Sequence, residues 1–234
     1  MKIALILTGH ARRYQSTYDS VKENLINVHN VDVYLSTWSI DNPGRRYGAP
    51  DWYEPTPLDL PALLEKINPH KLHLEDYHNF YSNRFPNVDI TSATRPDDIF
   101  KINDHAIRHG SFWVERQRDQ WYMIKKGWEL IENPNQYDLV FRLRTDTKLI
   151  KLDLKNIGKL VLPDTEVNGT HSVCDHMAYG PPELMEKYCN FFDHIKPMYV
   201  NDNVNIAHAD EMLGIYLSRY CNVPYVLDNI RYEH

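Results

Sequence analysis

Two short apolar runs separated by one amphipathic segment constrain the fold of this chain more than any other feature of its sequence. The first run, Ile3–Leu7, is uniformly apolar and ends at Gly9, which is typical of a strand buried on both faces. Ser16–Val28 has the apolar spacing of a helix, with its first serine as the expected cap, and Val31–Ser36 is a second strand. Such a unit normally has parallel strands joined by a right-handed crossover, so we predict an α/β fold.

The remainder of the chain continues with helices and strands in mixed order. The expected helices are Leu58–Ile67, His105–Glu132, Glu183–His194 and Asp210–Tyr220, and the expected strands are Lys71–Leu74, Leu139–Leu143, Lys159–Leu162, Ser172–Tyr179 and Val223–Leu227. Four apolar residues of the long helix should face the core: Trp121, Ile124, Trp128 and Ile131. Residues 40–57 form a long loop rich in Pro and Gly, a kind of segment that is often functional. This order predicts a three-layer α/β domain over residues 1–234 and leaves open that the domain is one module of a longer protein.

Composition and charge exclude several classes of function. The 234 residues hold 26 Lys and Arg against 32 Asp and Glu, a formal net charge of −6, which argues against a general nucleic-acid binder. No apolar run reaches the roughly 18 residues that a membrane span needs, and the apolar start lacks a signal-peptide cleavage site. The three cysteines form no CxxC pair, so we expect a reducing, cytoplasmic setting.

A first candidate ligand segment follows the first expected strand and contains Thr8, Gly9, His10, Arg12 and Arg13. In open α/β sheets, ligands bind beyond the carboxyl ends of the strands. The glycine allows close backbone approach and the two arginines offer donors to phosphate oxygens, although a solvated turn with surface arginines is the alternative interpretation. The glycine spacing matches neither GxGxxG nor Walker A, so a dinucleotide fold or a P-loop kinase has little support.

A second candidate segment is the strand Leu139–Leu143, which runs directly into charged residues. Strand alternation predicts that Arg142, Arg144 and Asp146 lie on the same side. Because buried charges are costly unless they are paired or bound to a ligand, a divalent cation on Asp146 and a diphosphate on the arginines would satisfy all three. A structural Arg–Asp pair at the edge of the sheet is the alternative.

Two further segments carry polar groups near the ends of expected elements. Asp175 and His176 come just before a strand that ends in a Gly turn, and a bend with exposed polar residues is the alternative interpretation. Asp210 and Glu211 stand at the start of an expected helix, where the helix dipole favours acids. One of these two acids is a candidate general base toward an attacking hydroxyl, and the neighbouring His208 is a candidate metal ligand.

Six segments occur in an order that resembles small glycosyltransferases of the GT-A fold. They are KIALILTGHARR, VDVYLSTWS, the long Trp- and Tyr-containing helix, YDLVFRLRTDTKL, DHMAYGPPELMEKY and HADEMLGIYLSR. The resemblance is to enzymes that glycosylate the capsids of chlorella viruses and to those of bacterial capsule and lipopolysaccharide clusters. It spans Lys2 to about Arg219, and the order of the segments carries it rather than any one motif.

The resemblance implies a three-layer α/β/α fold with a mostly parallel central mixed sheet and a nucleotide-diphosphate sugar across the carboxyl ends of its first strands. It implies a DxD-type motif that holds Mn²⁺ or Mg²⁺, of which Asp146 matches the last acid, while Arg144 stands in place of the first acid. The implied donor contacts are Thr8, Gly9, Arg12 and Arg13 for nucleotide and phosphate, Thr37 and Trp38 near the base, and Asp175 and His176 between donor sugar and acceptor. Asp210 or Glu211 matches the base of inverting members.

The expected function is therefore transfer of a sugar from a UDP- or GDP-sugar to a glycan or glycoprotein hydroxyl, assisted by a divalent metal, with an inverting route favoured. The main alternative is a non-catalytic nucleotide-sugar or carbohydrate-binding domain, suggested by the missing first acid and by an aromatic content of 16 Tyr and 5 Trp. A third hypothesis comes from the string Arg108-His109-Gly110, which also occurs in histidine phosphatases. It is disfavoured because the string does not follow an expected strand.

Overall fold

The structure is a computed structural model that describes residues 1–42, 56–77, 79–80, 112–167, 170–173, 175–201, 209–228 and 230–233. The strands are β1 (Lys2–Gly9), β2 (Asn30–Trp38), β3 (Ile40–Asn42), β4 (Thr56–Pro57), β5 (Lys71–Glu75), β6 (Leu139–Arg144), β7 (Lys148–Lys151), β8 (Leu160–Val167), β9 (Thr170–Val173), β10 (Met177–Gly180), β11 (Tyr225–Asp228) and β12 (Arg231–Glu233). The helices are α1 (Tyr14–Val21), α2 (Leu60–Ile67), α6 (Phe112–Glu129), α7 (Pro182–Cys189), α8 (Phe191–Asn201) and α9 (Ala209–Ile215). Short π-helical turns extend α1 over Lys22–Ile26 and α9 over Tyr216–Tyr220, and a 3₁₀ turn covers Pro134–Gln136.

A mixed sheet runs through the centre of the described residues in the order β11-β8-β10-β6-β1-β2-β5, with β9 paired to β8. The strands β6, β1, β2 and β5 are parallel, whereas β10 runs antiparallel to both of its neighbours. As predicted, Ile3–Leu7 is buried on both faces, because β1 lies between two parallel strands under helices on either side.

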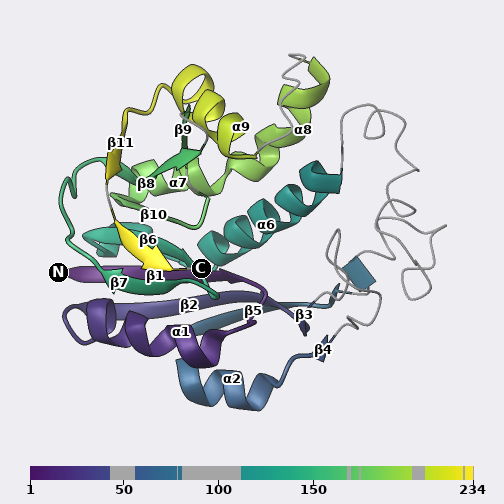
Figure 1. Ribbon diagram of the computed structural model, residues 1–234, viewed down its shortest axis with the longest axis vertical. Helices are drawn as coiled ribbons and strands as arrows, with labels where there is room; N and C mark the ends of the chain where they lie inside the picture. The colour runs from purple at the N-terminus through teal and green to yellow at the C-terminus, as the bar shows by residue number, and fades with distance from the viewer. Residues whose placement is uncertain are drawn as a thin grey trace.

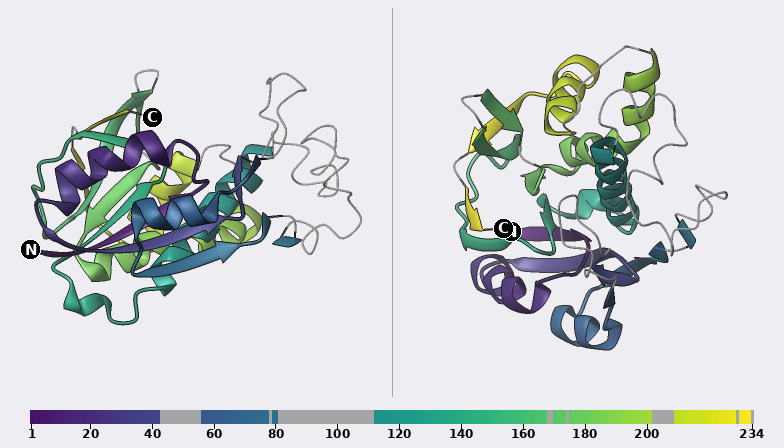
Figure 2. Two further views of the ribbon diagram at one scale, coloured as in Figure 1. Left: turned by 90° about the horizontal axis from the view of Figure 1, so that it is seen from below. Right: turned by 45° about the vertical axis from the view of Figure 1, so that its right-hand side comes forward.

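Helices cover both faces of the sheet and produce the three layers that the sequence predicts (Figures 1 and 2). On one face, Ala4 and Ile6 belong to a core built with α6, α7, α8 and α9. On the other face, Ile3, Leu5 and Leu7 pack into a core with α1 and α2. The four expected core residues of the long helix are buried against the first face: Trp121, Ile124, Trp128 and Ile131. The predicted α/β/α architecture with a mostly parallel mixed sheet is therefore confirmed.

The first loop and helix differ from the sequence-based expectation. The helix begins at Tyr14 rather than after Ser16, because Arg13 occupies the N-cap position in the left-handed region with φ 64°. Its cap makes no side-chain hydrogen bond, and the Ser16 hydroxyl instead donates to the Arg13 carbonyl at 3.0 Å from within the first turn. The change moves the start of α1 next to the loop that follows β1.

Three later elements also differ. The expected strand Ser172–Tyr179 is two strands, because β9 pairs with β8 while β10 inserts between β8 and β6. The expected helix Glu183–His194 is broken at Asn190 into α7 and α8. The short antiparallel pair β7–β12 was not predicted, because its two strands lie far apart in the sequence. Most of the loop 40–57, the start of the long helix before Phe112 and the string Arg108-His109-Gly110 lie outside the described residues.

Within the ranges given above, no helix combines the length and the apolar character needed to cross a bilayer.

Candidate functional site

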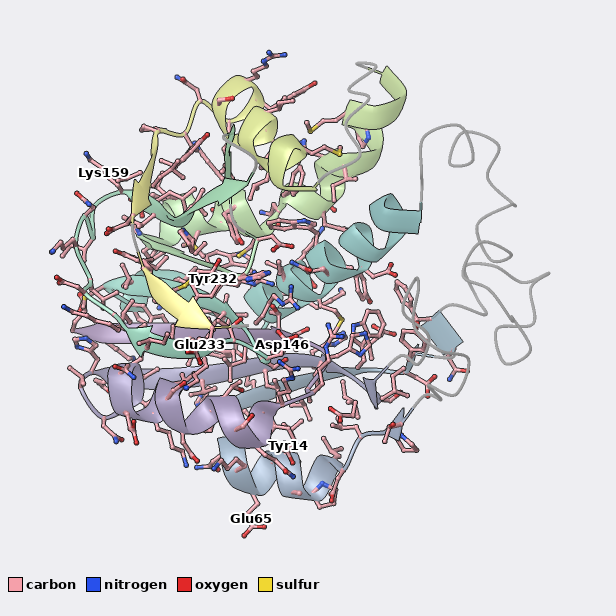
Figure 3. The ribbon with its side chains drawn as sticks, in the orientation of Figure 1. Tyr14, Glu65, Asp146, Lys159, Tyr232 and Glu233 are labelled. Carbon is pink, nitrogen blue, oxygen red and sulfur yellow. The ribbon has the colours of Figure 1, made fainter. Side chains whose placement is uncertain are left out.

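The candidate site lies at the edge where the parallel strands β1, β2 and β6 end. Register places Thr8 opposite Arg144 and Gly9 opposite Thr37. Because parallel strands end at a common edge, the first and second candidate segments meet there despite about 130 intervening residues. Gly9 adopts a φ of 100°, in the left-handed region that favours glycine, and so turns the chain from β1 toward α1. Asp146, just beyond β6, and Tyr14, the first residue of α1, are labelled in Figure 3.

Asp146 is the centre of an ion-pair cluster at this edge. Arg144 binds it in a bidentate manner, with Nε 2.9 Å from Oδ1 and Nη2 2.9 Å from Oδ2. Arg12 approaches from the loop after β1, with its Nε 3.2 Å from Oδ2. The aspartate is only 4% exposed, so these charge-assisted contacts are formed largely out of water. The structure therefore brings together Arg12, Arg144 and Asp146.

The predicted placement of Arg142, Arg144 and Asp146 on one side of a strand is wrong in part. The strand ends at Arg144 and a turn follows, so Asp146 does not continue the alternation. Arg142 is completely buried and donates hydrogen bonds to Thr8 and to the Asp175 carbonyl. Arg144, two residues later, does reach Asp146.

Arg142 is held by two segments that are distant in the sequence. Its Nε donates to the Thr8 hydroxyl at 3.0 Å, and its Nη1 donates to the backbone carbonyl of Asp175. Its buried Nη2 has no hydrogen-bond partner among the described residues. A buried N–H group without an acceptor destabilises a protein by about 1–3 kcal/mol. An oxygen atom that accepts a hydrogen bond from this Nη2 would therefore stabilise the site.

Asp175 and His176 lie between β9 and β10 and contact the same arginines. Gln120 of α6 donates to Asp175 Oδ2 at 2.8 Å, and His176 Nε2 lies 3.4 Å from Oδ1. Burial raises the pKa of Asp175, but the positive charges of His176, Arg144 and Arg142 and the Gln120 hydrogen bond together hold it below its usual value. Asp175 is therefore a carboxylate at neutral pH.

Thr37 and Trp38, expected near a nucleotide base, support the first loop. The Thr37 hydroxyl donates to the Gly9 carbonyl at 2.8 Å. Trp38 is 2% exposed and stacks on the His10 ring, with 5.9 Å between ring centroids, while Tyr77 packs edge-on against it. The three rings form an aromatic cluster beside the loop that carries Arg12.

Several residues at the site carry no sequence signal that predicts their role. Thr145 ties the two arginine-bearing segments together, because its N–H donates to the Thr8 carbonyl at 3.1 Å and its hydroxyl donates to the His10 carbonyl. Asp41 lies near Arg12, where burial raises the pKa of its carboxyl group and the arginine charge opposes that rise. Gln120 and Tyr232, which packs against the His176 ring, were also missed, since neither occurs in a recognisable motif.

The remaining candidate residues are not placed beside Asp146 by the described part of the structure. Arg13 is exposed just before α1, whereas Asp146 pairs with Arg12 and Arg144. Asp210 and Glu211 fall within α9, but their side chains lie outside the described part of the chain, as does the whole of His208.

The expected divalent cation does not fit the described residues. Both carboxylate oxygens of Asp146, the expected ligand, are engaged by guanidinium groups at 2.9–3.2 Å. In the described part of the chain, no group of three or more His, Cys, Asp or Glu side chains is arranged to hold a metal ion. A cation at this carboxylate would lie beside two guanidinium charges in a nearly buried site.

Comparison with solved structures gives a distant structural likeness. No family model matches the sequence, and no curated protein matches it. Among solved structures, the chain is similar to the crystal structure of a glycosyltransferase involved in the glycosylation of the major capsid of PBCV-1. The match has a TM-score of 0.44 and 9% sequence identity, and it covers 98% of this chain and 83% of that chain.

Proposed function

We propose that this protein is a glycosyltransferase that moves a sugar from a UDP- or GDP-sugar to a hydroxyl of a glycan or glycoprotein. The observation that carries the proposal is the gathering of Arg12, Arg142 and Arg144 at the carboxyl edge of parallel strands in a mixed α/β sheet. Ligands of such sheets bind at this edge, and guanidinium groups match the geometry of phosphate oxygens.

The chemistry of glycosyl transfer requires what these residues offer. When the bond between the anomeric carbon and the diphosphate oxygen breaks, negative charge develops on the leaving group. Guanidinium groups already held in place stabilise that charge without further reorganisation. Arg144 is fixed by Asp146, and Arg142 is fixed by Thr8 and the Asp175 carbonyl, so both are positioned before the ligand arrives.

The acceptor half of the reaction concerns the attacking hydroxyl group. An inverting displacement needs a carboxylate that takes the proton of the attacking hydroxyl. We assign this role to Asp210 or Glu211 on the basis of the sequence resemblance. Asp175, with its lowered pKa, remains ionised and is suited to binding sugar hydroxyl groups rather than to holding a proton.

The proposal is tested by thermal stabilisation with UDP, GDP, ADP and a panel of UDP- and GDP-sugars, followed by an assay for released nucleotide. A ligand that binds only the folded state at 100 times its Kd adds about 2.7 kcal/mol of stability, so a rise of several degrees in Tm is expected for one nucleotide. Binding with sugar transfer to a glycan acceptor supports the enzyme. Binding with no transfer or donor hydrolysis supports the alternative, a non-catalytic nucleotide-sugar-binding domain, and no binding of any nucleotide overturns the proposal.

A further inference from the structure

We propose that the site binds the diphosphate group through its arginines without a divalent cation, and that Asp146 positions Arg12 and Arg144 instead of ligating a metal. This inference rests on the proposed nucleotide-sugar function and specifies how its leaving group is held. It departs from the expectation that the sequence alone raises, in which the same aspartate carries Mn²⁺ or Mg²⁺.

The first support is the state of the Asp146 carboxylate. Its two oxygens accept the bidentate Arg144 pair at 2.9 Å each, and Oδ2 also faces Arg12 Nε at 3.2 Å. Mg²⁺ binds carboxylate oxygens at about 2.1 Å, so a cation there would sit within a few ångströms of two guanidinium charges. At such a separation in a 4% exposed environment, repulsion between cations is strong.

The second support comes from Arg142, which lies on the same strand two residues before Arg144. Residues two apart on a strand project to the same face, so the two guanidinium groups start from neighbouring positions. The Nη2 of Arg142 is buried and has no acceptor among the described residues. A phosphate oxygen supplies that acceptor, whereas a metal ion does not.

The third support is the network that fixes these arginines from several elements. Thr145 anchors the turn after β6 to the backbone of the loop after β1, and the Thr17 hydroxyl of α1 donates to the Thr145 carbonyl at 2.8 Å. The Arg144 N–H donates to the His176 carbonyl at 3.0 Å. These contacts fix the backbone segments that carry the arginines before any ligand binds. Donors that are already in position can stabilise the charge that develops on the leaving diphosphate.

The test compares nucleotide binding by the intact protein in EDTA and in Mn²⁺. Isothermal titration calorimetry with UDP and GDP gives the Kd under both conditions, and inorganic pyrophosphate serves as a probe without a base. We expect one nucleotide to bind in EDTA with a Kd within about threefold of its value in Mn²⁺, and pyrophosphate to compete with it. We also expect the electron paramagnetic resonance signal of free Mn²⁺ to stay undiminished when protein alone is added.

Variants then separate the arginine role from a general effect of charge. Arg12→Gln and Arg144→Gln should each weaken binding in EDTA by about tenfold or more, as expected for lost charge-assisted hydrogen bonds. Arg219→Gln is the matched control, because Arg219 is exposed on the π-helical turn after α9. The nucleotide Kd of this variant should equal that of the parent protein. If Arg144→Gln does not fold, Arg144→Lys keeps the charge but lacks the bidentate geometry, and weaker binding is again expected.

The outcomes distinguish this inference from the function on which it rests. Two results would overturn the arginine site and leave the glycosyltransferase proposal intact. One is nucleotide binding that occurs in Mn²⁺ and disappears in EDTA. The other is Mn²⁺ binding by the protein that is lost in Asp146→Asn. Unchanged binding in the Arg12 and Arg144 variants also overturns it. Absence of nucleotide binding under both conditions overturns the proposed function and this inference together.

Discussion

At the scale of single residues, Asp175 shows how a buried carboxylate is kept ionised. Burial alone would favour its neutral form, but His176, Arg144 and Arg142 supply positive charge and Gln120 supplies a hydrogen bond. Its folded-state pKa therefore lies below the unfolded value of about 3.9. A carboxyl group with a lowered folded pKa stabilises the protein above its unfolded pKa, and that stability is lost as the pH falls through the folded pKa.

Asp175→Asn is expected to lower the free energy of unfolding at pH 7 by about 1–3 kcal/mol, the usual range for a lost charged hydrogen bond. The difference from the parent protein should stay constant above about pH 5 and shrink below about pH 4, because the aspartate of the unfolded parent chain then takes up a proton before the folded carboxylate does. Urea unfolding of both proteins at pH 7 and pH 3.5 measures this difference in the free energy of unfolding. Asp153→Asn, at an exposed ion pair with Lys155, is the control and should change stability by no more than about 0.5 kcal/mol. A deficit for Asp175→Asn that does not shrink at pH 3.5 would contradict the role assigned to its charge.

At the scale of elements, the close approach of α6 to β1 sets the position of the site. Gly127 of α6 lies directly against the sheet, where a Cβ atom would collide with the Ile6 side chain and crowd Thr8. Thr8 in turn accepts the hydrogen bond of Arg142, and Gln120 on the same helix holds Asp175. The helix therefore positions both the strand that ends at the site and one of its carboxylates.

Gly127→Ala tests this packing. Alanine is the better helix former by about 1 kcal/mol, but the collision with a buried β-branched side chain costs about 1–3 kcal/mol. We expect a net loss of stability of up to about 2 kcal/mol, measured as a lower urea midpoint with an unchanged m-value. Gly158→Ala is the matched control, because nothing lies within 4 Å of the added Cβ and its φ is not positive. Equal stability of the two variants would show that α6 does not need the glycine contact.

At the scale of the whole molecule, the segment after β11 returns to the opposite side of the sheet from α9. Ile230 is 8% exposed within the core formed with α1 and α2, and β12 then pairs with β7. Tyr232 of β12 packs against His176 with 5.5 Å between ring centroids. The segment 230–233 thus joins the core of the second face to the candidate site, and Tyr232 is labelled in Figure 3.

Ile230→Ala is expected to lower stability by about 2–4 kcal/mol, because it removes a buried side chain and leaves a cavity. The exposed Ile157, at 50% exposure, provides the control, since Ile157→Ala should change stability by at most about 0.5 kcal/mol. Thermal unfolding of both variants gives the comparison. A change for Ile230→Ala as small as that of the control would mean that the segment after β11 is not part of the cooperative core.

The sequence by itself determined the elements whose signals are local. The apolar run of β1, the parallel unit with β2, the strand β6 and the four core residues of α6 follow from periodicity, because burial on a face imposes a spacing along the chain. It also identified Arg12, Arg144 and Asp146 as charged residues at a strand edge.

Only the tertiary structure decided which of these charges meet. The pairing of Asp146 with Arg12, the contacts of Arg142 with Thr8 and Asp175, and the insertion of β10 between β8 and β6 join segments tens to more than a hundred residues apart. Strand alternation could not predict them, because the strand ends at Arg144 and the turn redirects Asp146. Partners of buried charges are chosen by the contacts of the folded chain, and a pattern of neighbouring residues does not contain that information.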